Sequence, residues 1–107
     1  MTTFDKRTKA YENKFAHDAE IQFKVTARRN NLLGLWAAGR LHLDPAKAKS
    51  YAKEIVEIHV DFSSDEEVVS KILVDFEAAS IPSGRDAIMD MLDLFSEMAR
   101  EQIVGEA

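Results

Sequence analysis

At 107 residues and 12.1 kDa the chain can form one modest hydrophobic core, but it is too short for a substrate domain joined to a catalytic one. Hydrophobic residues make up 46% of it, while four glycines and two prolines are too few for the frequent turns of an all-β protein. The absence of cysteine excludes disulfide frameworks, thiol nucleophiles and thiolate metal sites. With no apolar leader and no apolar run near the roughly 18 residues of a membrane span, we expect a soluble, cytoplasmic protein without direct membrane insertion.

The first predicted helix begins near Thr3 or Asp5 and continues to about Ala38, with Gly39 as its expected stop. Its first part carries a narrow aromatic stripe with charged flanks, and its last part, LLGLWAA, is apolar on several sides and indicates burial. The charges are unevenly placed. Residues 1–31 hold seven basic and four acidic side chains, whereas the remainder holds seven basic and fifteen acidic ones. This asymmetry predicts a basic arm on an acidic body.

Three shorter helices follow. Asp44 as N-cap and Pro45 at the first helical position predict a second helix to about Val60. The capping box that starts at Ser64 opens a third helix, over about 65–79, which Ile81-Pro82 ends. Ser83 is the expected N-cap of a fourth helix that runs to about Ile103, with Asp86 at its third position. The predicted inward residues of these helices are Ala48, Tyr51, Ala52, Ile55, Val56, either Ile58 or His59, Val69, Ile72, Leu73, Phe76, Ile88, Met91, Leu92, Phe95, Met98 and Ala99.

Helix lengths predict the architecture, an all-α antiparallel four-helix bundle with a long first helix and a mobile N-terminal arm. At 1.5 Å per residue the last three helices are roughly 24 to 32 Å long, whereas the first is about 50 Å. The first helix must therefore extend beyond its partners. We expect residues 1–19 to be a basic, weakly ordered arm and residues 20–107 to be the bundle body, because helices without packing partners fray.

No set of residues predicts catalysis, so we expect a protein that is not an enzyme and uses no cofactor. His17, His42 and His59 lack partners at metal-ligand spacing, and neither a nucleophile elbow nor a phosphate-binding loop is present. No feature points to nucleic acid. Arg28 and Arg29 could hold a nucleotide or another anion, which keeps open the alternative of an ADP- or ATP-binding regulatory bundle; pairing with the acidic body is the simpler interpretation.

The aromatic stripe formed by Phe4, Tyr11 and Phe15 has no core to enter if the arm extends beyond the body. An amphipathic helix with aromatic anchors that projects from a domain is suited to a partner's groove. Self-packing or homodimerisation is the competing interpretation.

The first helix contains a series of distinctive segments, which are Phe4-Asp5, Tyr11-Glu12, KFAHD at 14–18, Phe23-Lys24 and ARRNNLLGLWAA at 27–38, and the second contains YAKEIV at 51–56. In these segments the chain resembles the ATPase inhibitor ζ subunit of alphaproteobacterial F-type ATP synthases. The resemblance is specific in the first half of the chain and looser after about Val60.

The resemblance implies an endogenous inhibitor of ATP hydrolysis, located in the cytoplasm and held at the inner membrane through the synthase. Its N-terminal segment would insert between α and β subunits of the F1 head near the rotating γ subunit. It would block rotation in the hydrolytic direction and allow synthesis. By position, the inhibitory segment here is residues 2–19. The implied partner-binding residues are the anchors Phe4, Tyr11 and Phe15 and the basic residues Lys6, Arg7, Lys9 and Lys14, which would pair with acidic groups in the cleft.

Overall fold

The structure, a computed structural model, describes residues 3–60 and 65–106, with side chains described at 19–58 and 65–106. Four helices account for most of these residues: α1 (Thr3–Arg40), α2 (Pro45–Val60), α3 (Asp65–Ala78) and α4 (Arg85–Glu106). The prediction of an all-α, four-helix fold is therefore confirmed. The described part of the chain contains no strand.

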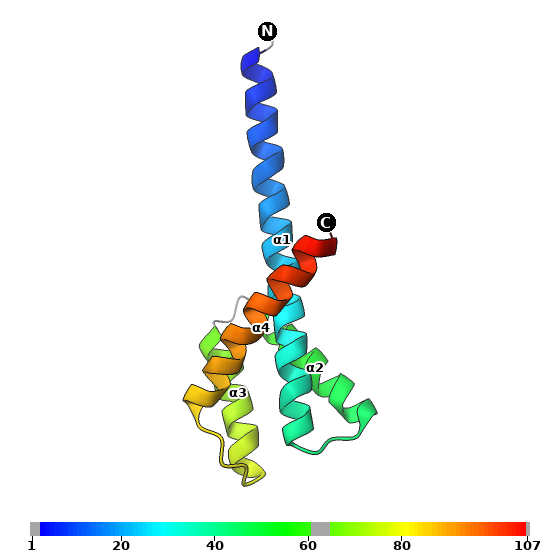
Figure 1. The fold of residues 1–107 in the computed structure, drawn as a ribbon, viewed down its shortest axis with the longest axis vertical. Coiled ribbons are helices and arrows are strands. Elements are labelled where there is room, and N and C mark those ends of the chain that lie inside the picture. Colours follow the sequence, from blue (N-terminus) through cyan, green and yellow to red (C-terminus); the bar gives the residue numbers. More distant parts are fainter. Residues whose placement is uncertain (1–2, 61–64, 107) are drawn as a thin grey trace.

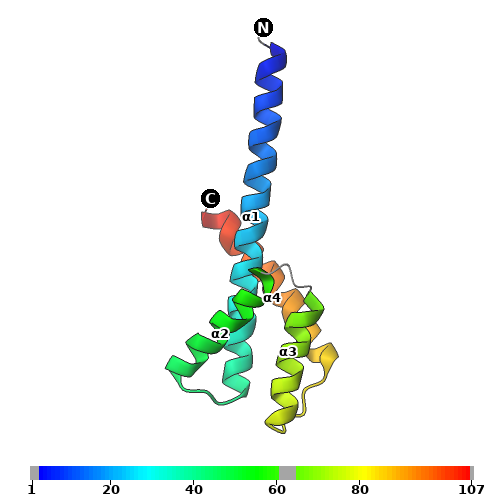
Figure 2. The same cartoon turned by 180° about the vertical axis from the view of Figure 1, so that it is seen from behind.

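The long helix α1 is the axis of the molecule, which measures 66 × 24 × 21 Å (Figure 1). Helices α2, α3 and α4 gather around its C-terminal half, and its N-terminal half stands clear of them in both opposite views (Figures 1 and 2). At 38 residues α1 is about 57 Å long, against about 24 Å for the 16 residues of α2. The projecting part follows from this difference in length.

The beginning of α2 agrees with the prediction. The Asp44 carboxylate accepts a hydrogen bond from the backbone N–H of Lys47 at 2.8 Å, and Pro45 is the first helical residue. This bond satisfies one of the amides that a helix N-terminus leaves without a partner.

The ends of α1 and α3 share a geometry that the sequence analysis missed. His42 and Ser80 both have positive φ, 58° and 59°. At the end of α1, the N–H of His42 donates to Gly39 and that of Leu43 donates to Ala38; Ser80 and Ile81 repeat this pattern at the end of α3. Both ends are Schellman motifs with an ordinary side chain where glycine is usual. The prediction that Gly39 stops α1 is wrong, since Gly39 lies within the helix.

The predicted N-cap of α4 is also shifted by one residue. The Gly84 carbonyl accepts the first helical hydrogen bond, from the N–H of Ile88 at 3.3 Å, so the cap is Gly84 rather than Ser83. Asp86 then occupies the second helical position, where its charge still complements the helix dipole. Ser64, the predicted cap of α3, lies outside the described residues.

The core lies between the lower half of α1 and the other three helices. Trp36 is half-buried and meets Phe76 edge to face, with ring centroids 5.7 Å apart. Leu35, which belongs to the segment LLGLWAA whose composition indicated burial, is 43% exposed. Ala48, Val56, Ile58, Leu73, Met91, Phe95 and Met98 are half-buried, and His59 lies outside the residues whose side chains are described. The buried core residues are Val25, Leu33, Ala37, Ala38, Tyr51, Ala52, Ile55, Val68, Val69, Ile72, Phe76, Ile88, Leu92, Ala99 and Ile103.

Helices α1 and α2 approach each other closely at Gly34. A Cβ atom at this position would lie 2.6 Å from the Cα of Ala52 and 3.2 Å from the Cγ1 of Ile55. Only a residue without a side chain allows the two backbones to come so near. Gly34 therefore fixes the crossing from which α2 leaves α1.

Candidate partner-binding helix

The candidate site is the projecting part of α1, which continues without a break into the body. The seven predicted partner-binding residues all belong to this segment, and the side chains of residues 3–18 lie outside the described set. Their roles therefore stay predictions, as does the division of the chain at residue 19.

Side chains are described from the base of the projecting segment onward. Ala19, Glu20, Gln22, Phe23 and Lys24 are exposed. Lys24 pairs with Glu20 across one turn at 3.3 Å, a surface contact that contributes little to stability. Phe23 is 57% exposed, an unusual position for a large aromatic side chain.

The first buried side chain of α1 in the described part of the chain is Val25. It forms a small cluster with Ala99 and Ile103 of α4, against which Ile21 and Leu32 of α1 pack. This cluster is separate from the main core, which begins at Leu33 on α1. The end of α4 crosses α1 at this level (Figure 1). The point at which α1 leaves the body is thus held by α4.

Arg28 links the same two helices through polar contacts. Its guanidinium donates to both carboxylate oxygens of Glu106, at 3.0 and 3.3 Å, and to the side-chain oxygen of Gln102 at 3.1 Å. The bidentate geometry makes this stronger than an ordinary surface pair. Phe23, Lys24, Ala27 and Asn31 of α1 line a shallow groove beside this contact.

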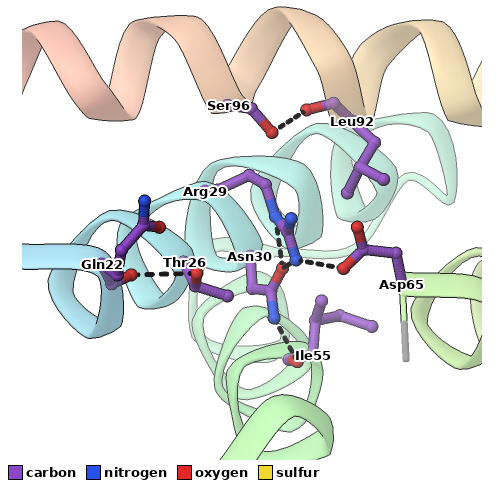
Figure 3. A network of polar contacts seen from close by, with 8 residues as sticks. All are labelled: Gln22, Thr26, Arg29, Asn30, Ile55, Asp65, Leu92 and Ser96. Carbon is purple, nitrogen blue, oxygen red and sulfur yellow. Dashed lines mark hydrogen bonds and ion pairs between the residues drawn. The ribbon is translucent and has the colours of Figure 1, made fainter. Parts of the chain in front are cut away.

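Arg29 and Asn30 form a buried polar connection between three helices (Figure 3). The guanidinium of Arg29, which is 8% exposed, donates to the Asn30 side-chain oxygen at 3.0 and 2.9 Å and to the Asp65 carboxylate at 3.0 Å. Asn30, fully buried, donates from its amide to the Ile55 carbonyl in α2 at 3.4 Å. Buried polar groups require such partners, so this set of contacts joins α1 to both α2 and the start of α3.

Both arginines suggested as anion ligands thus take part in interhelical contacts. An incoming phosphate would compete with Glu106 for Arg28, and with Asp65 and Asn30 for Arg29. The interpretation that these residues pair with the acidic body agrees with the geometry. Nucleotide binding at this position stays a prediction, which a titration with ADP would test.

A second polar group ties α2 to α3. The Tyr51 hydroxyl donates to the Asp75 carboxylate at 2.7 Å, and the Lys71 ammonium donates to the same oxygen at 2.8 Å. Burial, together with the hydrogen bond and the negative charge of Asp75, raises the pKa of the Tyr51 phenol above its ordinary value. The bond from Tyr51 to Asp75 therefore joins α2 to α3.

The part of the chain that the structure describes holds neither a metal site nor a membrane span. Within residues 19–58 and 65–106, where side chains are described, no three acidic or histidine side chains gather as a metal ion would require. No helix within residues 3–60 and 65–106 has the length and apolar character to cross a membrane.

Sequence reasoning missed three features at the base of the arm: the burial of Asn30, the identity of Glu106 as the acidic partner of Arg28, and the contact of Ile103 with Val25. Each feature joins two separate helices through residues that lie 25 to 78 positions apart in the sequence. The apolar period of α4 continues from Ala99 to Ile103 at a spacing of four, and this was the one available signal.

An all-α body that carries a long projecting helix is typical of a protein that acts by binding another protein. Comparison with known families agrees with this class. The family model of ATPase inhibitor subunit zeta matches residues 1–102, and the chain belongs to this family. The match covers both the projecting segment and nearly the whole body, which confirms the resemblance found in the sequence. A search of curated proteins found no match. The family is one of inhibitor subunits rather than catalytic ones.

Proposed function

We propose that this protein inhibits ATP hydrolysis by the F1FO-ATP synthase, with residues 2–19 as the segment that enters a catalytic α/β interface near the γ subunit. The observation that carries the proposal is the projecting half of α1 in a chain whose family match begins at residue 1. A helix that stands clear of its own body has a surface free for a partner. The protein would then be held at the cytoplasmic face of the inner membrane by the synthase.

The charge and length of the segment suit this role. Residues 2–19 carry four basic and three acidic side chains, and this small positive excess would favour capture by an acidic surface on F1. Bound in the cleft, the aromatic residues Phe4, Tyr11 and Phe15 would supply apolar contact area. Lys6, Arg7, Lys9 and Lys14 would pair with acidic groups of the cleft. Inhibition in the hydrolytic direction alone would follow if rotation during synthesis reopens the interface that holds the segment.

Deletion of residues 2–19 tests the proposal directly. The shortened chain should keep the helical circular dichroism and the melting transition of the body, because the core lies at Leu33 and beyond. It should lose inhibition of ATP hydrolysis by purified F1. Retained inhibition by a folded, shortened chain would overturn the proposal.

A triple alanine substitution at Phe4, Tyr11 and Phe15 tests the anchors. Inhibition should weaken by at least about a hundredfold, since aromatic anchors at interfaces often contribute more than 1 kcal/mol each. The matched control replaces Leu35, Val74 and Leu94, which are exposed on the body, with alanine. The control should inhibit like the wild type. Equal inhibition by both triple variants would refute the assignment of the anchors.

A further inference from the structure

The base of the arm is held differently from the rest of α1. From Leu33 onward α1 belongs to the main core, and at Arg29 and Asn30 it is tied to α3 and α2. Between residues 21 and 28, the buried apolar cluster and the hydrogen bonds to another helix both involve α4. They are the small cluster around Val25 and the polar contacts of Arg28.

The contributing residues lie in the last two turns of α4. Ala99 and Ile103 are buried against Val25, and Gln102 and Glu106 accept hydrogen bonds from Arg28. We refer to these four α4 residues as the C-terminal brace. Their spacing of three and four places them on one side of the helix, facing α1.

We propose that the C-terminal brace positions the inhibitory arm by keeping residues 21–28 of α1 helical and fixed on the body. This proposal rests on the proposed function, because it concerns how the arm is presented to F1. Arg28 and Ile103 would affect inhibition only through the arm that they hold in place, and they are therefore positioning residues.

The physical reason lies in the cost of starting a helix. The first turn of an isolated helix is unfavourable, whereas each residue added to an existing helix needs only propagation. The braced part of α1 gives the arm a helix that is already formed. Without the brace, the ordered template would end near Arg29, about two turns further into the body.

Loss of the brace would also change where the arm points. The segment between the body and the inhibitory residues would lengthen by about eight residues of frayed chain, and the arm would sample many directions. Ordering these residues on binding costs free energy, so affinity for F1 would fall although every arm residue is unchanged.

The first test needs no partner. Ile103→Ala should raise amide hydrogen exchange in residues 21–28 at least about tenfold, because removal of a buried side chain weakens local packing. Exchange at Leu33–Ala38 should stay close to that of the wild type. Val104→Ala is the matched control, since Val104 is the next residue in α4 and is 60% exposed. Unchanged exchange at 21–28 in a folded Ile103→Ala variant would overturn the proposal.

The polar half of the brace is tested by charge exchange. Arg28→Glu places two carboxylates against each other, and residues 21–28 should exchange several times faster and the protein should inhibit F1 several times less well. Adding Glu106→Arg restores opposite charges at the same positions and should recover a large part of both properties. If Arg28 and Glu106 contributed only to general stability, exchange and inhibition would not change and recover while the melting temperature of the body stays the same in all variants.

The inhibition assay separates the two proposals. If the wild type inhibits F1 and Ile103→Ala exchanges faster at 21–28 yet inhibits equally well, the positioning role of the brace is refuted and the proposed function stands. If the wild type itself does not inhibit, the proposed function fails and the inhibitory role of the brace fails with it. In that case the exchange measurement still decides whether α4 holds the base of α1.

Discussion

Gly34 offers the sharpest test of how α1 and α2 are held together. Replacement by alanine would place the new Cβ atom 2.6 Å from the Cα of Ala52 and 3.2 Å from both its Cβ and the Cγ1 of Ile55. Carbon atoms pack at about 3.5–4.0 Å, so the helices would have to separate by roughly 1 Å. The atom closest to the new methyl group belongs to the backbone and cannot rotate away.

Two opposing terms set the expected magnitude. Overpacking of a core costs about 1–3 kcal/mol, and Gly→Ala in a helix returns about 1 kcal/mol of propensity. Separation of α1 from α2 would also stretch the bond from Asn30 to the Ile55 carbonyl, which is already 3.4 Å long. We therefore expect Gly34→Ala to lower the free energy of unfolding by about 1–2 kcal/mol, or the melting temperature by roughly 5–15 °C.

Gly39→Ala is the matched control. Gly39 lies in the same helix without a positive φ, and nothing is within 4 Å of its Cβ position. It gains the propensity term without the clash, so its melting temperature should rise by a few degrees. Thermal unfolding of both variants by circular dichroism checks the argument. If Gly34→Ala were as stable as Gly39→Ala, the close approach of the α1 and α2 backbones at Gly34 would be refuted.

Three further variants test local contacts. Tyr51→Phe should remove a loss of stability at alkaline pH. Because the Tyr51 pKa is raised, the folded protein keeps a proton that the unfolded chain releases above about pH 10, so the stability of the wild type falls there as pH rises. Comparison of urea unfolding at pH 8 and 11 would detect this loss in the wild type and its absence in Tyr51→Phe. Ser80→Gly should raise the free energy of unfolding by about 0.5–1 kcal/mol, since φ is 59° at this exposed residue; a lower melting temperature would contradict the motif. Asp44→Ala should cost about 1 kcal/mol through loss of the bond to Lys47, and an unchanged urea midpoint would show that the cap is not needed.

Much of the fold could be predicted because its signals are local. The cap at Asp44 and the proline after it act within one turn, and the apolar period of each helix lies within that helix. The length of α1 follows from the absence of proline over residues 1–38. The extension of α1 beyond its partners needed only the comparison of helix lengths.

The prediction of the end of α1 was wrong because the residue type that is usual at a helix end does not occupy that position here. Gly39 is the favoured type for a helix end, yet α1 continues to Arg40 and ends in the Schellman motif with His42 at positive φ. Leu43, one residue beyond His42, packs against the core and selects that endpoint. Tertiary packing thus overrides the local preference for glycine.

The candidate site divides in the same way. The projecting segment could be anticipated from its aromatic stripe and from helix length. The brace could not, because the contact of Arg28 with Glu106 spans 78 positions and depends on the angle at which α4 crosses α1. Nor does the sequence indicate that Arg29 and Asn30 are buried, since their types and positions resemble a solvated polar face.

The tight crossing at Gly34 also has a consequence for the order in which the chain folds. Helices α1 and α2 are joined by the four residues 41–44, so their contacts close a short loop, whereas the contact of Arg28 in α1 with Glu106 in α4 spans 78 positions. Short-range contacts form early because they lose less chain entropy. In stopped-flow experiments, Gly34→Ala should therefore slow refolding, whereas Ile103→Ala should mainly speed unfolding. The base of the arm would be the last part of α1 to become fixed.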